Sequence, residues 1–419
     1  MRVLVGKNKV KGKVRAPSSK SYTIRGLMCA ALTKGESEVI HPLGSDDTEA
    51  AINVLEEVGV SVRKEADLWR VTGGDFHEPE NNLFCGESAA TLRFMTAICS
   101  LIPGKCQLVA GSSLSWRPVS PLVRALRQLG VDCSCRSGVA PVIVKGGRLK
   151  GGETELPGNI SSQFISALLL ISPFAEEGVV IRLTTPLESK PYVLMTLACL
   201  RRFGIRVSKT FDGFEVAKQI YKPAKYEVEG DWSSASYFLA LGAVCGEVKV
   251  ENLNPESLQG DKMMLNFLRD MGALVKVSQN SVSVGKSRLN AIRADLSDCI
   301  DLLPTMAVLA AAAGGVSRFA GIERARIKES NRVAAVKEGL ERMGVKVTEE
   351  RNRLTIVGTR PKGSVIDSKG DHRIAMAFSV LGSVVGDTII DKAECVSKTF
   401  PEFWDILRSI GGKLEINGK

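Results

Sequence analysis

The sequence has few histidines and no cysteine pair spaced for a metal or redox centre. Only three histidines, His41, His77 and His372, occur in 419 residues, and they lie far apart. The ten cysteines include no Cys-x-x-Cys pair, so a zinc site would lack nearby ligands. We therefore expect plain buried or surface thiols and no metal site.

Long apolar runs are also missing. No run approaches the ~20 residues that a membrane-spanning helix needs. The N-terminal segment MRVLVGKNKVKGKVR has no apolar signal core and alternates like a strand. We expect a cytoplasmic protein with no membrane partner.

Aromatic residues are scarce, at 5%, whereas positive charge is in excess, with a net charge of +10 and a pI of about 9.1. Such an excess indicates anionic partners, which are either nucleic acid or small anionic substrates. Nucleic-acid-binding repeat proteins usually combine basic tracks with stacking aromatics. The basic residues here come one or two at a time among acids, which favours small anions and no nucleic acid.

The chain is organised as an internal repeat of about 70 residues. Polar or acidic residues lead into an apolar helix pattern, followed by a turn and a strand. The six helix starts are Ser18, Glu87, Ser161, Trp232, Asp301 and Asp371.

A second helix in each repeat closes on a glycine and is followed by a strand. Each glycine stands where a helix would end in the left-handed conformation. These glycines are Gly59, Gly130, Gly204, Gly272, Gly344 and Gly411.

Together these elements predict a strand–helix–strand–helix–strand–strand unit used six times. The first helices are apolar nearly all round, which predicts buried helices with sheets outside. The six units divide into two lobes of three, with a linker at residues 222–230 and a Lys- and Arg-lined cleft between the halves. A partner-binding solenoid is the alternative, but its repeats are usually shorter.

The residues at the helix starts point to chemistry. Helix N-termini favour anions, and Lys20, Arg25, Arg93 and Arg373 stand beside them. Capping can explain each serine or aspartate by itself. It does not explain why cations recur beside them in several repeats.

Two further features stand at predicted helix starts in the second half. Residues 324–332, RARIKESNR, place four cations around the carboxylate of Glu329. Asp301 opens an apolar helix, where burial raises a carboxyl pKa and nearby cations lower it. Either acid could move a proton.

At these residues the chain resembles the 5-enolpyruvylshikimate-3-phosphate synthases. The motifs, all in the family's order, are PSSKSYTIR, SDDT, TLRF, WRPVSPL, GNISSQF, ESKPY, the Asp301 helix, RIKESNR, GDHRIAM and SKTFPEF. The resemblance implies an α/β fold of two lobes, each of three βαβαββ repeats with buried helices and outer sheets, the inside-out α/β barrel of enolpyruvyl transferases. It places residues 1–15 and 229–419 in the C-terminal lobe, on the phosphoenolpyruvate side, and residues 16–228 in the N-terminal lobe, on the shikimate 3-phosphate side.

The implied reaction joins shikimate 3-phosphate to phosphoenolpyruvate and releases phosphate, in chorismate and aromatic amino acid biosynthesis. It needs no metal or organic cofactor, and we expect a monomer. The implied ligands of shikimate 3-phosphate are Lys20, Ser21, Arg25, Ser161, Ser162, Gln163, Ser189, Tyr192, Asp301 and Lys328. The implied ligands of phosphoenolpyruvate are Lys20, Ala89, Arg93, Arg117, Gln163, Arg332, His372, Arg373 and Lys398.

The resemblance also implies roles in an addition–elimination. Asp301 would accept the proton of the 5-hydroxyl, and Glu329 would deliver a proton to C3 of phosphoenolpyruvate. Lys20 would assist both steps, and His372 would bind or only orient its neighbours.

Two segments depart from the family pattern. Ala89 stands where glycine is usual beside the phosphoenolpyruvate pocket, and Ala90 replaces a threonine. The family's inhibitor glyphosate occupies this pocket and is longer than phosphoenolpyruvate. Since an added methyl in a tight pocket can cost ~1–3 kcal/mol for the molecule that it crowds, we expect glyphosate to inhibit this enzyme poorly. Arg324 stands where asparagine is common, which leaves its role open.

The sister transferase that acts on UDP-N-acetylglucosamine is the nearest alternative. That family carries a catalytic cysteine five residues before its Arg-Pro. Here Ser112 stands five residues before Arg117 and Pro118, which favours shikimate 3-phosphate.

Overall fold

The computed structural model describes residues 1–417, and the chain folds into two compact units. Met1–Pro17 and Gly230–Lys419 form one unit, here the C-terminal lobe, and Ser18–Glu229 form the other, here the N-terminal lobe. The chain thus passes between units at Pro17 and Glu229, where the sequence predicted crossings near Arg15 and Glu229.

Each lobe contains three four-stranded sheets of one plan, in which the first two strands are parallel and the others antiparallel. The strands of the N-terminal lobe, sheet by sheet, are β14 (Lys225–Glu227), β3 (Gly35–Ile40), β5 (Leu68–Gly73) and β4 (Ser61–Lys64); β6 (Leu83–Phe84), β7 (Gly104–Val109), β9 (Val139–Gly146) and β8 (Asp132–Arg136); β10 (Gly152–Leu156), β11 (Val179–Leu183), β13 (Gly213–Val216) and β12 (Ser208–Lys209). Those of the C-terminal lobe are β2 (Lys11–Arg15), β15 (Glu247–Glu251), β17 (Ser281–Gly285) and β16 (Leu274–Ser278); β18 (Arg293–Asp295), β19 (Val316–Ala320), β21 (Arg353–Val357) and β20 (Val347–Glu350); β22 (Val365–Asp367), β23 (Thr388–Asp391), β1 (Arg2–Val5) and β24 (Leu414–Asn417).

Three strands complete sheets whose other strands lie far away in the sequence. The alternating N-terminal segment forms two strands rather than one: β1 pairs with β23 and β24, and β2 pairs with β15. The predicted linker also contains a strand, β14, which pairs with β3. It is held there because the buried Tyr226 ring lies where a Cβ on Gly26 would be, 2.6 Å from its nearest ring carbon.

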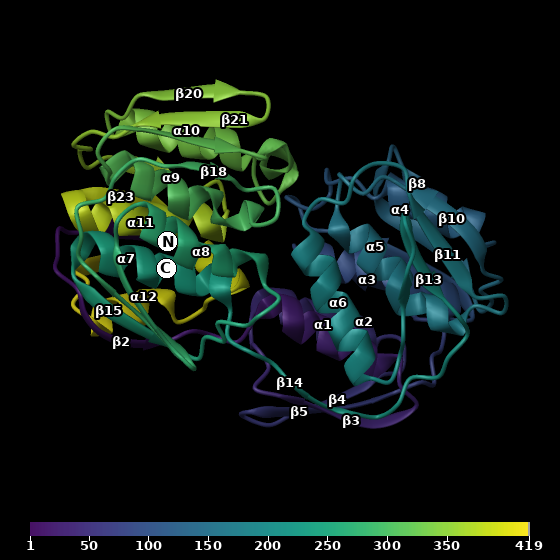
Figure 1. The fold of residues 1–419 in the computed structure, drawn as a ribbon. Coiled ribbons are helices and arrows are strands. Elements are labelled where there is room, and N and C mark those ends of the chain that lie inside the picture. The colour runs from purple at the N-terminus through teal and green to yellow at the C-terminus, as the bar shows by residue number, and fades with distance from the viewer. Residues whose placement is uncertain (418–419) are drawn as a thin grey trace. The chain divides into compact units, whose positions relative to one another are not determined.

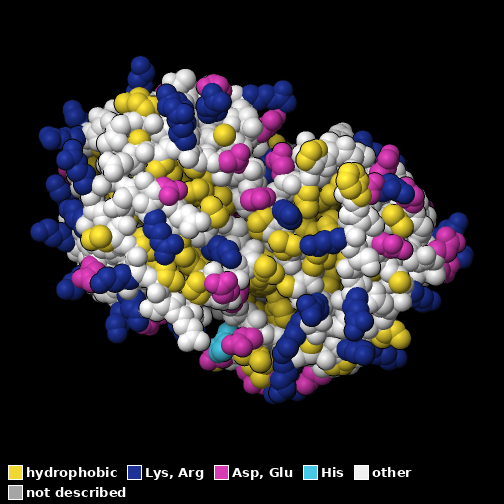
Figure 2. Space-filling view, in the orientation of Figure 1, with side chains coloured by type: hydrophobic (Ala, Val, Ile, Leu, Met, Phe, Trp, Pro, Cys, Tyr) yellow, Lys and Arg dark blue, Asp and Glu magenta, His cyan; other side chains and the backbone are white. Residues whose placement is uncertain are grey.

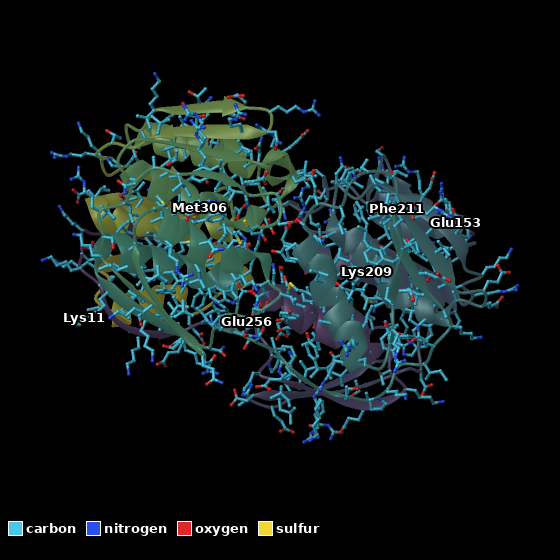
Figure 3. The ribbon with its side chains drawn as sticks, viewed as in Figure 1. Lys11, Glu153, Lys209, Phe211, Glu256 and Met306 are labelled. Carbon is cyan, nitrogen blue, oxygen red and sulfur yellow. The ribbon has the colours of Figure 1, made fainter. Side chains whose placement is uncertain are left out.

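Six helices are buried nearly all round, as their apolar patterns predicted. In the N-terminal lobe α3 packs against α5, and in the C-terminal lobe α11 packs against α7 and α9, with strands outside (Figure 1). Met306 in the middle of α9 is fully buried, whereas the Lys11 side chain on β2 is 83% exposed (Figure 3). These inner helices are α1 (Lys20–Ala31), α3 (Ala89–Ile98), α5 (Ser162–Ile171), α7 (Trp232–Cys245), α9 (Leu303–Ala312) and α11 (His372–Val385).

The second helix of each repeat ends as predicted. All six glycines that follow these helices have a positive φ, between 80° and 102°. These helices are α2 (Asp46–Glu56), α4 (Ser120–Gln128), α6 (Lys190–Arg202), α8 (Met264–Asp270), α10 (Arg332–Arg342) and α12 (Phe403–Ser409). Short 3₁₀ turns add η1 (Cys99–Leu101), η2 (Ser172–Phe174), η3 (Gly260–Met263), η4 (Ile300–Leu302), η5 (Glu323–Ile327) and η6 (Ala393–Lys398).

Each lobe has its own hydrophobic core, so each can hold side chains at its helix starts in fixed positions. In the part of the chain that the structure describes, none of the helices could span a membrane. The same residues contain no group of three or more His, Cys, Asp or Glu suited to a metal ion.

Candidate active site

The C-terminal lobe builds a charged cluster around Arg332, the first residue of α10. Its side chain is 1% exposed. Its Nε donates to Asp371 Oδ2 at 2.8 Å, its Nη1 to Asp301 Oδ1 at 2.7 Å, and its Nη2 to Glu329 Oε2 at 2.6 Å. One planar guanidinium therefore fixes three carboxylates from three different segments.

Asp301 lies in η4, one turn before α9, rather than in the helix itself. Arg373 Nη2 contacts its Oδ2 at 3.1 Å, and Lys328 Nζ lies 3.4 Å from its Oδ1. Burial opposes the charged form, but Arg373, Lys328 and Arg332 outweigh it and hold the pKa of Asp301 well below its ordinary value. Asp301 is therefore an ionised carboxylate surrounded by cations.

Lys328 shows the opposite balance. Burial is the largest influence and lowers the pKa of the Lys328 ammonium to about 8, although Asp301 attracts its charge. The pKa of Arg332 is raised: burial opposes its charge, but Asp371, Glu329 and Asp301 favour it more strongly. Arg332 therefore stays charged, whereas Lys328 titrates at about pH 8.

Three more predicted residues, His372, Arg373 and Lys398, lie at or beside the start of α11. Asp371 caps the helix by accepting from the backbone N–H of Arg373 at 3.0 Å. His372 is 1% exposed, with its Nδ1 4.0 Å from Asp371 Oδ1. Lys398 Nζ donates to the carbonyl of Gly370 at 3.2 Å, so it lies beside this helix start.

In the N-terminal lobe, Arg25 on α1 joins the starts of α1 and α6. It is 2% exposed and donates to the carbonyls of Ser21 and Tyr192 and to Thr196 Oγ1, at 2.9, 3.2 and 2.8 Å. Ser166 on α5 contacts Thr196 Oγ1 at 2.8 Å. Arg25 therefore fixes Ser21 and Tyr192 relative to each other.

Arg93 on α3 forms the second group in this lobe. Its Nη1 donates to Gln163 Oε1 at 2.6 Å and to Ser161 Oγ at 3.2 Å, and its Nη2 donates to the carbonyl of Pro118 at 3.1 Å. Pro118 follows Arg117, which is 5% exposed. The structure thus brings Arg93, Ser161 and Gln163 into contact. Arg117 directly precedes Pro118, whose carbonyl Arg93 also contacts.

The remaining predicted residues of this lobe lie at helix starts. Lys20, first in α1, pairs with Asp47 of α2 at 2.7 Å. Ala89 and Ser162 are the first residues of α3 and α5. Ser189 precedes α6 in a left-handed conformation, with φ 53°.

Capping accounts for part of the helix-start pattern. Ser88, Ser161, Asp231 and Asp371 each accept a hydrogen bond from a backbone N–H of the following helix. Ser19 makes no side-chain cap bond. Capping therefore explains these serines and aspartates. It does not explain the neighbouring Lys and Arg residues, whose side chains belong to the charged clusters described above.

Sequence reasoning missed several acidic partners. Asp371 and Asp47 stand inside quoted motifs, but an N-cap signature does not reveal a salt bridge. Asp261 in η3 is 2% exposed and accepts from Ser233 Oγ. Burial and then the charge of Asp301 raise the pKa of Asp261 to about 7. The available sequence signal was that Asp261 directly follows a glycine, in the segment QGD.

On the face that Figure 2 shows, the basic residues do not form a continuous track. On the face shown in Figure 2, Lys and Arg are dispersed among Asp and Glu. Arg324 is 7% exposed and donates to the carbonyl of Ser297. The ten cysteines are free thiols, and all of them except Cys135 are buried.

Comparisons with known proteins identify the family of the chain. A family model described as EPSP synthase (3-phosphoshikimate 1-carboxyvinyltransferase) matches residues 4–407. The chain is 50% identical over 418 residues to a 3-phosphoshikimate 1-carboxyvinyltransferase of Dehalococcoides mccartyi, with 99% of each chain covered. It is 40% identical over 419 residues to the protein of that name from Methanocaldococcus jannaschii, with 98% of each chain covered.

Solved structures extend the likeness to the fold. An EPSP synthase from Acinetobacter baumannii superposes with a TM-score of 0.84 at 26% identity, with all of both chains covered. The enolpyruvyl transferase NikO from Streptomyces tendae, at 16% identity, has a TM-score of 0.81 over 99% of this chain and 98% of that one. The predicted enolpyruvyl transferase fold is confirmed, and the chain belongs to the EPSP synthase (3-phosphoshikimate 1-carboxyvinyltransferase) family.

Proposed function

We propose that this chain transfers the enolpyruvyl group of phosphoenolpyruvate to the 5-hydroxyl of shikimate 3-phosphate and releases phosphate. The observation that carries the proposal is the buried Arg332, which fixes Asp301 and Glu329 beside Lys328. Two carboxylates for proton transfer and adjoining cations for anionic substrates are what this reaction needs. Family membership supplies the identity of the two substrates.

The first half of the reaction is an addition. The 5-hydroxyl oxygen attacks C2 of phosphoenolpyruvate, C3 gains a proton to become a methyl group, and the hydroxyl proton leaves. Asp301 accepts the hydroxyl proton, and Glu329 delivers the proton to C3. Lys20 assists both transfers.

The second half is an elimination. The bond from C2 to the phosphate oxygen breaks, the methyl group loses a proton, and the enolpyruvyl ether and inorganic phosphate form. Glu329, now a carboxylate, takes that proton back. Lys20 and the arginines stabilise the charge on the departing phosphate.

Substrate binding also suits Asp301 to its role. Within this cluster, the cations hold the pKa of Asp301 well below its ordinary value, which makes Asp301 a weak base. When Lys328, Arg332 and Arg373 turn part of their charge toward substrate phosphate and carboxylate groups, their hold on Asp301 weakens. Its pKa then rises, and it becomes a better proton acceptor.

The proposed ligands of each substrate are the residues that the sequence predicted. For shikimate 3-phosphate, Arg25 orders the starts of α1 and α6 that carry Ser21, Ser189 and Tyr192. Ser161, Ser162 and Gln163 at the start of α5 complete this set, with Lys20, Asp301 and Lys328. For phosphoenolpyruvate the proposed set is Lys20, Ala89, Arg93, Arg117, Gln163, Arg332, His372, Arg373 and Lys398.

The deciding experiment is phosphate release from phosphoenolpyruvate with shikimate 3-phosphate, repeated with Glu329→Ala. We expect turnover by the wild type and loss of at least about a hundredfold in kcat in the variant. A wild type without activity that instead binds single-stranded nucleic acid tightly and with strong salt dependence would refute the proposal.

The enzyme is proposed to act as a cytoplasmic monomer. Light scattering tests the oligomeric state.

A further inference from the structure

Glu87 makes a set of contacts that no role described above requires. It precedes Ser88, the cap of α3, and reaches across to the loop between β7 and α4. Its Oε1 accepts from the backbone N–H of Ser113 at 3.2 Å and from Ser112 Oγ at 3.4 Å. Its Oε2 accepts from Ser113 Oγ. One carboxylate therefore holds two successive loop residues.

The loop is shaped to receive this carboxylate. The backbone N–H of Gly111 donates to the carbonyl of Gly86 at 2.7 Å, which brings the two segments together. A Cβ on Gly111 would lie 2.4 Å from Glu87 Oε1 and 2.7 Å from its Cδ. No other residue type fits there with the Glu87 side chain in place.

The same loop carries Arg117. Its backbone N–H donates to the carbonyl of Leu114 at 3.0 Å, and Leu114 is fully buried. At the far end, Arg93 Nη2 holds the carbonyl of Pro118. Arg117 thus lies on a segment fixed at its beginning by Glu87 and at its end by Arg93.

We propose that Glu87 is a positioning residue for Arg117, a role that rests on the proposed binding of phosphoenolpyruvate by Arg117. By fixing Ser112 and Ser113, Glu87 orders the segment from Gly111 to Pro118 before the substrate arrives. Without Glu87, phosphoenolpyruvate must order the loop as it binds. The entropic cost of that ordering lowers the affinity for phosphoenolpyruvate. Hydrogen bonds to a carboxylate are stronger than neutral ones, which suits this task.

Glu87→Ala tests the proposal by steady-state kinetics. We expect the KM for phosphoenolpyruvate to rise about tenfold, as for the loss of hydrogen bonds to a charged group. We expect kcat and the KM for shikimate 3-phosphate to stay within about twofold, because an affinity lost equally in ground and transition states changes KM alone. Glu87→Gln keeps an oxygen acceptor for the Ser113 N–H and should restore most of the affinity.

Glu78 offers a matched control at the other end of β7. Its Oε1 accepts from the backbone N–H of Lys105 at 2.7 Å, so Glu78→Ala also removes a carboxylate from a backbone amide. It is expected to leave both KM values unchanged. An equal rise in the KM for phosphoenolpyruvate in Glu78→Ala would mean that loosening the lobe anywhere has this effect, and would overturn the proposal.

A double-variant cycle separates positioning from general stabilisation. If Glu87 acts through Arg117, then Glu87→Ala should add nothing to the KM of Arg117→Ala. Ser113→Ala removes one contact from the loop side and should raise the KM about two- to threefold, which keeps a test available if Glu87→Ala does not fold. Additive effects in the cycle, or an unchanged KM in Glu87→Ala or in Ser113→Ala, would contradict the proposal. A wild type inactive with both substrates would instead refute the proposed function.

Discussion

Arg332 and Asp371 form an ion pair in which both side chains are at most 1% exposed, with Nε 2.8 Å from Oδ2. Asp371 Oδ1 accepts a second bond from Arg332 Nη2 at 3.3 Å. Asp371 also caps α11, and Arg332 opens α10. The pair therefore joins two helix starts and leaves Nη1 directed to Asp301.

Removing Arg332 should damage stability as well as catalysis. Arg332→Ala leaves Asp371 buried without its cation, so the free energy of unfolding should fall by about 3–5 kcal/mol. Arg332→Lys keeps one charge but cannot reach three carboxylates, so it should lose activity with a smaller loss of stability. Urea unfolding and phosphate-release assays measure both effects.

The control for Arg332 is an arginine in an exposed ion pair. Arg351 lies 2.8 Å from Glu323, with side chains 85% and 50% exposed. Such pairs contribute little, so Arg351→Ala should unfold near the wild-type midpoint. Equal losses in the free energy of unfolding of Arg332→Ala and Arg351→Ala would show that the buried Arg332 pair stabilises the protein no more than an exposed pair.

Lys328 should set an alkaline limit on activity. Its pKa is lowered to about 8, chiefly by burial, so the free enzyme loses this cation as pH rises through about 8. If the cation holds anionic substrate, kcat/KM should fall over that range. Lys328→Arg stays charged and should abolish this alkaline limb.

The pH profile of Lys337→Arg provides the comparison. Lys337 lies on α10, the helix that follows Lys328 in the chain, 3.7 Å from Glu349 and partly exposed, and its replacement should retain the limb. An alkaline limb that persists unchanged in Lys328→Arg would assign the titration to another group.

The repeat and the helix starts were predictable because local chemistry fixes them. Gly59 and its five counterparts end helices in a conformation that only glycine adopts cheaply, and apolar periodicity reveals a buried helix. The three-residue strand β14 was not foreseen, because its apolar content is a single Tyr226 and its partner β3 is distant in sequence.

The partners of the site residues were harder to predict for the same reason. Asp371 satisfies a helix cap and a buried ion pair at once, and the sequence shows only the first. Glu87 meets Ser113 across a tertiary contact that depends on Gly111. Pairings between segments become visible only once packing has set their distances.

Asp261 should make stability depend on pH. Burial, followed by the charge of Asp301, raises its pKa to about 7 in the folded protein, above the ordinary value of about 3.9 in the unfolded chain. Its stabilising contribution is therefore fully present below about pH 4 and is lost as pH rises through about 7. The asparagine in Asp261→Asn does not titrate. The melting temperature of this variant, relative to that of the wild type, should therefore be higher at pH 8 than at pH 5.

Asp405, which is 78% exposed in its pair with Arg408, offers the matched control for Asp261. Asp405→Asn should differ from the wild type by the same amount at both pH values. A difference between Asp261→Asn and the wild type that does not change with pH would contradict the raised pKa.

Ala89 should determine the response to glyphosate. It is the first residue of α3, 6% exposed, four residues before Arg93. If its methyl crowds an inhibitor longer than phosphoenolpyruvate, it costs that inhibitor ~1–3 kcal/mol. Ala89→Gly should then lower the half-inhibiting glyphosate concentration by about tenfold or more, with little change in the KM for phosphoenolpyruvate.

Ala97→Gly removes a methyl from the same helix, at a fully buried position farther from its start. It should cost stability, by about 1 kcal/mol from helix propensity alone, without changing inhibition. A wild type fully inhibited at low micromolar glyphosate, or an Ala89→Gly variant as insensitive as its parent, would rule out the Ala89 methyl as the selective element. Sensitivity gained by Ala89→Gly and not by Ala97→Gly would instead locate the selectivity at the start of α3, because both variants lose one methyl from one helix and differ only in where it stood.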